Sequence, residues 1–152
     1  CLEYSTQTFL ERLCKISWRI KMEQKSVVKL LQTKESLYVF DAAAEEDILS
    51  AEKALALRFA ADYREYVSAF GAASYCEHEL TGICKSARLN VVDVTQDERQ
   101  YNSVPADWYV IEEANIDGIV IWQATDGTVY RTRPGSEADK ICDSLEEYIS
   151  LE

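Results

Sequence analysis

The sequence is poor in the residues that break secondary structure and in those that carry much of enzyme chemistry. Its 152 residues include five Gly, two Pro and one His, so few long loops are expected. A Ser-His-Asp triad would have to use His78, and no G-x-S-x-G elbow accompanies it. Phosphate loops, dinucleotide-binding fingerprints and calcium-binding loops are also absent from the sequence. We therefore predict a compact domain that is not an enzyme and takes no cofactor.

The cysteines give no sign of a disulfide framework. Their number is five, and no two form a C-x-x-C pair, a pattern typical of reduced thiols and of a cytoplasmic protein. Cys76, His78 and Cys84 supply three zinc ligands without a fourth at a usual spacing, so no metal is expected. Cys76 and Cys84 are interpreted instead as small core residues. No apolar run reaches the roughly 18 residues of a membrane span, so no membrane partner is expected.

Negative charge dominates what is present. Asp and Glu number 27 against 16 Lys and Arg, which gives a net charge of -11. Such a field repels nucleic acid and anionic lipid, so we expect no nucleic-acid partner and favour a basic protein partner. Residues 1–21 depart from this balance, with four basic and two acidic residues. Because Met22 is the only methionine, residues 1–21 are hypothesised to be a non-native extension.

Helical periodicity marks the first half of the chain. Apolar residues at helical spacing over residues 9–20 predict a helix, and residues 1–34 are assigned to an N-terminal helical segment that precedes a domain at 35–152. Asp41 is the predicted N-cap of a helix that buries Ile48, Ala51 and Leu55. A second helix is predicted to end at Gly71 and to bury one face, comprising Tyr63, Tyr66, Val67 and Phe70.

Short strands are predicted for most of the second half. They are expected within residues 74–93, including the run Leu89–Val94, whereas residues 95–103 fit either a helical turn or a loop. Two apolar runs, Trp108–Ile111 and Ile119–Trp122, predict strands, and the second should be central and covered on both faces.

The end of the chain should add a hairpin and a helix. Asp126-Gly127 tolerates positive φ at both positions and predicts a tight antiparallel hairpin to a third strand at Val129. A closing helix is expected to begin at Ser136 and Asp139 and to bury a stripe that comprises Ile141, Leu145, Tyr148 and Ile149. The predicted class is α+β, with an antiparallel-rich sheet between N-terminal helices and a C-terminal helix.

Acidic and aromatic residues concentrate between positions 93 and 117. Seven acids stand there against the single base Arg99, interleaved with Tyr101, Trp108 and Tyr109. The cluster fits a solvated acidic face or a binding surface on which aromatics anchor and acids steer a basic partner. Adjacent Glu112 and Glu113 should point to opposite faces of a strand, which excludes a paired acid and base. The partner-binding candidates drawn from the cluster are Asp97, Glu98, Trp108, Glu112, Glu113 and Asp117.

The order of these elements resembles the SUKH superfamily, which includes yeast cell-wall assembly regulators and bacterial immunity proteins. The likeness spans Leu37 to Leu151 and rests on six segments: ILSAEKALAL, ADYREYVSAFGA, PADWYVIEE, GIVIW, DGTVY and KICDSLEEYI. One departure is that Ala60 and Ala61 precede Asp62 and Tyr63, where the family usually has Leu-Pro.

The resemblance implies a non-enzymatic immunity protein that binds and neutralises a cognate polymorphic toxin in the bacterial cytoplasm. Many such toxins are nucleases, which present cationic surfaces to phosphates, and an acidic antidote suits them. The alternative is a regulatory interaction scaffold that resembles the eukaryotic members. No motif transfers contact residues from the family to this chain, so the candidates above rest on the acidic and aromatic cluster alone.

Overall fold

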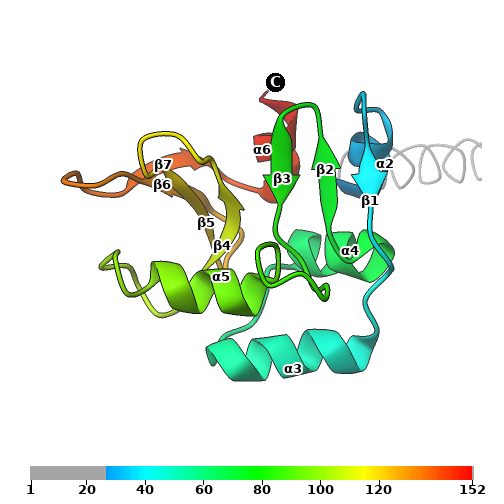
Figure 1. Ribbon diagram of the computed structural model, residues 1–152, viewed down its shortest axis with the longest axis horizontal. Helices are drawn as coiled ribbons and strands as arrows, with labels where there is room; N and C mark the ends of the chain where they lie inside the picture. Colours follow the sequence, from blue (N-terminus) through cyan, green and yellow to red (C-terminus); the bar gives the residue numbers. More distant parts are fainter. Residues whose placement is uncertain (1–26, 152) are drawn as a thin grey trace, which may run out of the picture.

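The computed structural model describes residues 27–151, which form an α+β domain around one seven-stranded sheet (Figure 1). The predicted fold class is confirmed. The helix predicted over residues 9–20 and the hypothesised extension 1–21 lie outside the described residues. The helices are α2 (Val27–Gln32), α3 (Glu45–Leu55), α4 (Ala61–Phe70), α5 (Val91–Glu98) and α6 (Leu145–Ser150). The strands are β1 (Tyr38–Val39), β2 (Ala73–Tyr75), β3 (His78–Leu80), β4 (Trp108–Glu113), β5 (Val120–Ala124), β6 (Val129–Thr132) and β7 (Asp139–Cys142).

The strands follow one another across the sheet in chain order, and every neighbouring pair is antiparallel. The ladder between β3 and β4 is the shortest of the sheet, since it has one residue pair, Leu80 with Glu112. Beyond that pair the two strands diverge, and Figure 1 shows β1 to β3 turned away from β4 to β7. The sheet therefore consists of a three-stranded and a four-stranded part.

Helix α3 begins later than predicted. Ala44 is its N-cap, without a side-chain cap, so the prediction that Asp41 caps the helix is wrong. The chain before it is held extended because the Phe40 amide donates to the carbonyl of Ala72 and the Ala43 amide donates to that of Val67. The predicted buried face of α3 is confirmed, since Ile48, Ala51 and Leu55 are all buried.

Helix α4 matches its prediction closely. Tyr63, Tyr66 and Val67 are fully buried, Phe70 is half-buried, and the helix ends at Gly71. Gly71 has a φ of +68°, and a Cβ there would lie 2.0 Å from the backbone oxygen of Asp41. Glycine is required at this helix end by both the backbone conformation and the close approach of another segment.

The strand predicted at Leu89–Val94 is wrong. The residues from Val91 onward form α5, and the Asn90 side chain caps the helix by accepting from the amide of Val92 at 3.0 Å. β-Branched residues favour strands, but Val91, Val94 and Thr95 are also spaced to bury one helix face. Strands β2 and β3 confirm the other part of the expectation for residues 74–93.

The closing helix also begins later than predicted. Residues 139–142 form β7 against β6, and α6 starts after Ser144, whose hydroxyl accepts from the Glu147 amide at 3.0 Å. The predicted start at Ser136 and Asp139 is therefore wrong, because sheet pairing overrides a local capping pattern. Of the predicted stripe, Leu145 and Ile149 are fully buried as expected, whereas Tyr148 is half-buried. Ile141 is also half-buried and belongs to β7, so its assignment to the helix is wrong.

The antiparallel hairpin of β5 and β6 is confirmed, although its turn differs in detail. Gly127 has a φ of +99°, whereas Asp126 does not have a positive φ. The Gly127 amide donates to the Ala124 carbonyl at 2.9 Å, and the Ala124 amide donates to Thr128. Residues 125–127 thus form a three-residue loop with glycine at its last position.

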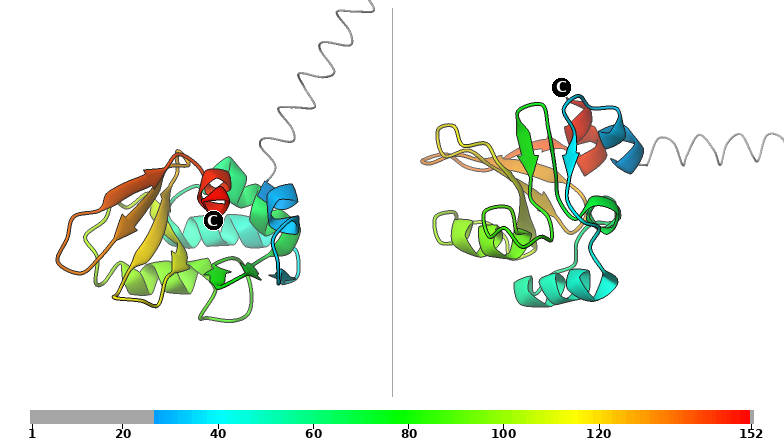
Figure 2. Two further views of the ribbon diagram at one scale, coloured as in Figure 1. Left: turned by 90° about the horizontal axis from the view of Figure 1, so that it is seen from above. Right: turned by 45° about the vertical axis from the view of Figure 1, so that its right-hand side comes forward.

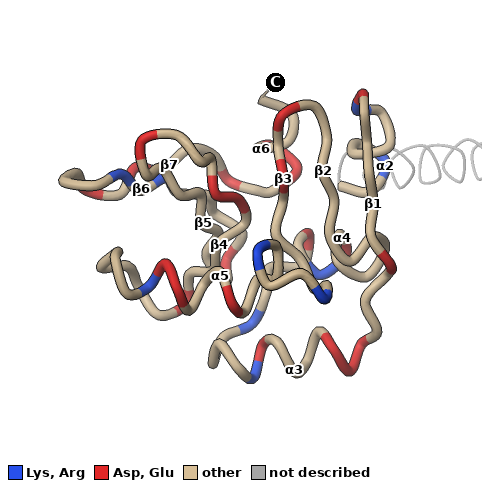
Figure 3. Tube along the Cα trace, viewed as in Figure 1, with Lys and Arg blue, Asp and Glu red and all other residues tan. Residues whose placement is uncertain are grey.

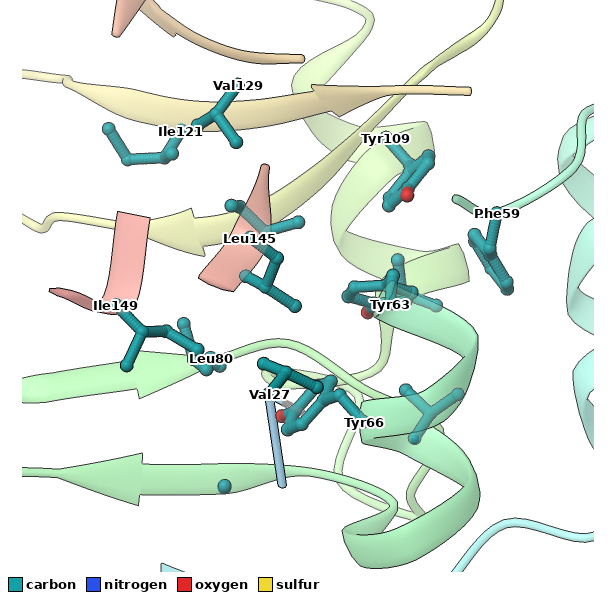
Figure 4. Packing of buried hydrophobic residues seen from close by; sticks show 14 of the residues in the cluster. Val27, Phe59, Tyr63, Tyr66, Leu80, Tyr109, Ile121, Val129, Leu145 and Ile149 are labelled. Atoms are coloured by element: carbon teal, nitrogen blue, oxygen red, sulfur yellow. The ribbon is translucent and has the colours of Figure 1, made fainter. Parts of the chain in front are cut away.

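Hydrophobic residues pack on both faces of the four-stranded part of the sheet. The main core joins α2, α3, α4 and α6 to the sheet, and Figure 4 shows Tyr63 and Tyr66 of α4 with Leu145 and Ile149 of α6. Figure 2 shows α2 and α6 close to α4. A second core lies between α5 and β4–β5 and includes Trp108 and Trp122. Strand β5 is therefore covered on both faces, as predicted.

Candidate interaction surface

The predicted binding residues come from three neighbouring segments. Asp97 and Glu98 end α5, Glu112 and Glu113 end β4, and Asp117 lies in the turn that connects β4 to β5. Figure 3 shows Asp and Glu along α5, β3 and β4. The structure brings some of these side chains together and separates others. The reason is that side chains of β4 point to two opposite faces, and each face packs against a different core.

Asp97, Glu98 and Glu113 form an acidic cluster between α5 and β4. Burial, followed by a hydrogen bond with Glu98 and by the charges of Glu98 and Asp97, raises the pKa of Glu113 to about 7. Carboxylates this close cannot all ionise without mutual repulsion. The cluster therefore holds excess negative charge that the fold neutralises incompletely.

An ion pair between Arg88 and Glu79 flanks the acidic cluster and was missed by the sequence analysis. Arg88, in the loop before α5, donates to Glu79 of β3, and this bond lowers the pKa of Glu79. The charge of Arg88 also opposes the rise in the pKa of Glu113. A recess of about 130 Å³ lies among Glu79, Arg88, Glu113 and Asn115. No local pattern could have found this pair, because its members are nine positions apart across an irregular loop.

Glu112 points to the opposite face of β4, as predicted from its position beside Glu113. It is 4% exposed and accepts hydrogen bonds from His78 Nδ1, at 2.9 Å to Oε2, and from the Tyr148 hydroxyl. Burial, followed by the charge of Glu112, raises the pKa of Tyr148. Glu112 thus ties β4 to β3 and α6 where β3 and β4 diverge.

His78 begins strand β3, and the interpretation of Cys76 and Cys84 as small core residues is wrong. Cys76 is exposed and Cys84 is half-buried. Across residues 27–151, no three side chains among His, Cys, Asp and Glu are grouped as metal ligands.

The aromatic members of the predicted cluster are mostly buried. Trp108 is 8% exposed and stacks on Tyr130, with 4.0 Å between the ring centroids. Tyr109 is fully buried, and its hydroxyl donates to Gln123 Oε1 at 2.7 Å and accepts from the Ala60 amide. Tyr101, which is 77% exposed, is the accessible ring of the three. Trp108 therefore supports the surface from beneath.

The arrangement presents an open acidic surface on which aromatic residues act as support. Asp97 and Asp117 are exposed, Glu98 and Glu113 are half-buried, and the charge of the cluster is suited to a basic ligand. No helix within residues 27–151 has the length and apolar character needed to cross a bilayer.

The domain has a recurrent α+β architecture. It begins with helices, continues as an antiparallel sheet whose strands follow one another in chain order, and ends with a short helix. A family model described as SMI1-KNR4 cell-wall, of the SUKH group, matches residues 24–151. The chain belongs to this family. Proteins of the family are generally immunity or regulatory proteins that bind other proteins and have no enzymatic activity. No curated protein matches the chain.

The family match begins at residue 24 and so includes α2, which lies within the predicted N-terminal segment 1–34. Val27 and Leu31 of α2 are fully buried against the main core. The division of the chain at residue 34 stays a prediction.

Proposed function

We propose that this chain is a non-enzymatic immunity protein that binds and neutralises a cognate polymorphic toxin in the bacterial cytoplasm, with a nuclease as the kind of toxin best suited to its charge. Family membership supports a protein-binding role. The net charge of -11 favours a cationic partner and disfavours binding to nucleic acid itself.

The observation that carries the proposal is the acidic cluster of Asp97, Glu98 and Glu113. Burial of Glu113, together with its hydrogen bond to Glu98 and the repulsion among the three acids, holds the pKa of Glu113 near 7, which costs stability at neutral pH. Surfaces that sacrifice stability in this way are common at functional sites. A basic side chain from a partner would relieve the repulsion, and the surrounding acids would accelerate association.

The predicted contact residues have two roles in this proposal. Asp97, Glu98, Glu113 and Asp117 face the partner from the open side of α5, β4 and the β4–β5 turn. Trp108 and Glu112 are buried, so they position β4 and contact no partner directly. The aromatic anchor of this surface is the exposed ring of Tyr101.

Co-expression with toxin domains encoded beside the gene tests the proposal. The native chain should restore growth of cells that make the cognate toxin, and the two purified proteins should associate at a rate that falls steeply with salt. The variant D97N/E98Q/D117N should associate at least about tenfold more slowly at low salt, because it removes three steering charges beside the contact. The control E35Q/E46Q/E137Q loses the same charge at exposed sites elsewhere and should change the rate about twofold or less. Equal effects of the two variants, or no rescue by the native chain, would contradict the proposal.

The family description favours one second candidate, a regulatory scaffold like the cell-wall regulators for which the family model is named. A scaffold would bind signalling proteins without protecting cells from any toxin. Absence of growth rescue together with saturable binding of a regulatory protein would select this alternative.

A further inference from the structure

A groove separate from the acidic cluster runs between α3 and α5. It encloses about 740 Å³, a volume typical of binding pockets. Its least exposed lining is largely apolar and comes from three segments: Phe40 after β1, Ala51 of α3, and Ile83 and Val92 on either side of the loop before α5. Burial also raises the pKa of the Cys84 thiol, so this lining residue is neutral at physiological pH.

The apolar part of this lining forms the floor of the groove, and three exposed carboxylates form its rim. They are Asp41 after β1, Asp47 in the first turn of α3 and Asp93 in the first turn of α5. Within the described part of the chain, none of the three forms an ion pair or a side-chain hydrogen bond with another residue. Some other acids of the fold are paired, as Glu45 is with Arg64 at 2.8 Å. Lys85 is the one basic residue among the described groove residues.

We propose that this groove is a docking site for a basic amphipathic segment of a partner protein, in which Arg or Lys side chains meet the three carboxylates and apolar side chains cover the floor. The inference rests on the proposed function and deepens it. Asp93 of the groove and Asp97 of the acidic cluster are one helical turn apart on α5, so the two sites adjoin along this helix. A toxin held at the cluster would place a neighbouring segment over the groove.

Charge decides between this occupant and others. An anionic ligand would be repelled by three carboxylates, and a neutral apolar peptide would bury them without compensation. A second copy of this chain carries the same net charge of -11 and would be repelled as well. A segment that is both basic and apolar satisfies the rim and the floor together.

The test uses the full chain and a synthetic peptide of alternating arginine and leucine. Fluorescence anisotropy should show saturable binding, and NMR should place the largest amide shifts at Ile83, Val92 and Asp93. Replacement of the peptide's leucines by serine should weaken binding at least about tenfold, because the floor is then left uncovered. Equal affinity of the serine peptide, or amide shifts centred elsewhere, would overturn the proposal.

Two variants separate the groove from general charge attraction. D41N/D47N/D93N should weaken binding about tenfold or more, whereas E35Q/D107N/E137Q, which loses the same charge at exposed sites elsewhere, should change it less than about twofold. Ser50→Trp keeps every charge and fills the groove from an exposed position on α3, so it should also weaken binding about tenfold. Equal effects of the two charge variants, or unchanged binding by Ser50→Trp, would refute the assignment.

The peptide experiment distinguishes this inference from the proposed function. It needs no toxin, so failure of growth rescue would refute the immunity role and leave the groove assignment standing. Conversely, growth rescue with no peptide binding at the groove would refute the groove alone.

Discussion

Glu112 and Glu113 are consecutive residues of one strand, yet their surroundings are opposite. Glu112 is buried and accepts hydrogen bonds from His78 and Tyr148. Glu113 is half-buried beside Glu98 and Asp97, and its pKa rises to about 7. The comparison shows that an acidic residue contributes to stability when donors surround it and opposes stability when other acids do.

The backbone of β4 accounts for this sorting. A register irregularity between Val110 and Glu112 places Ile111 in the main core and directs Glu112 to the same side. Glu113 then faces α5. Without the irregularity, strict alternation would send Ile111 and Glu112 to opposite faces and bury the wrong carboxylate against α5.

Of the substitutions that test this comparison, replacement of Glu112 should change the free energy of unfolding most. Glu112→Ala takes the acceptor away from His78 and Tyr148 and leaves a cavity between β4 and α6, so we expect a loss of about 3 kcal/mol in unfolding free energy. Urea denaturation measures it. Tyr148→Phe removes one of the two donors and should cost about 1 kcal/mol. A loss below about 1 kcal/mol for Glu112→Ala would mean that this polar contact contributes little.

Glu113→Gln should stabilise the protein, whereas Glu112→Ala should destabilise it. Because the pKa of Glu113 is raised from its ordinary value to about 7, the folded state keeps a proton that the unfolded chain releases, and stability falls as the pH rises through that window. Gln removes this cost, so we expect a gain of about 1 kcal/mol at pH 8, limited by solvent screening of a half-buried group. At pH 4.5 the gain should vanish. Urea melts at both values measure the difference, and an equal gain at both would show that charge is not its cause.

Asp97→Asn should change the free energy of unfolding least and should act mainly on the pKa of Glu113. Asp97 is exposed, so its replacement should change the unfolding free energy by less than about 0.5 kcal/mol. The pKa of Glu113 should nevertheless fall toward its ordinary range, because one of the repelling charges is gone. NMR titration of the Glu113 side chain measures the change. The matched control Asp107→Asn, also exposed, should leave the titration of Glu113 unaltered.

The elements that could be predicted from the sequence are those with strong local periodicity. The buried faces of α3 and α4, the end of α4 at Gly71 and the doubly covered strand β5 follow from apolar spacing and one glycine. The errors fall where two local signals compete. Val91 and Val94 suit a strand or a helix, and Ser136 with Asp139 resembles a cap although the chain continues into β7.

The candidate site was predictable in composition and only partly in geometry. The excess of acids between residues 93 and 117 is visible in the sequence, as is the opposition of Glu112 to Glu113. The burial of Trp108 against Tyr130 and the pairing of Arg88 with Glu79 are not, since each depends on segments that meet only after folding.

The sequence by itself determined an acidic α+β domain of the SUKH family, because charge, periodicity and element order are local or additive properties of the chain. Only the tertiary structure decided which acids are neutralised and which remain exposed around the acidic cluster and the groove. The physical reason is that charge interactions depend on distance and burial, and both are set when α3, α5 and β4 pack together.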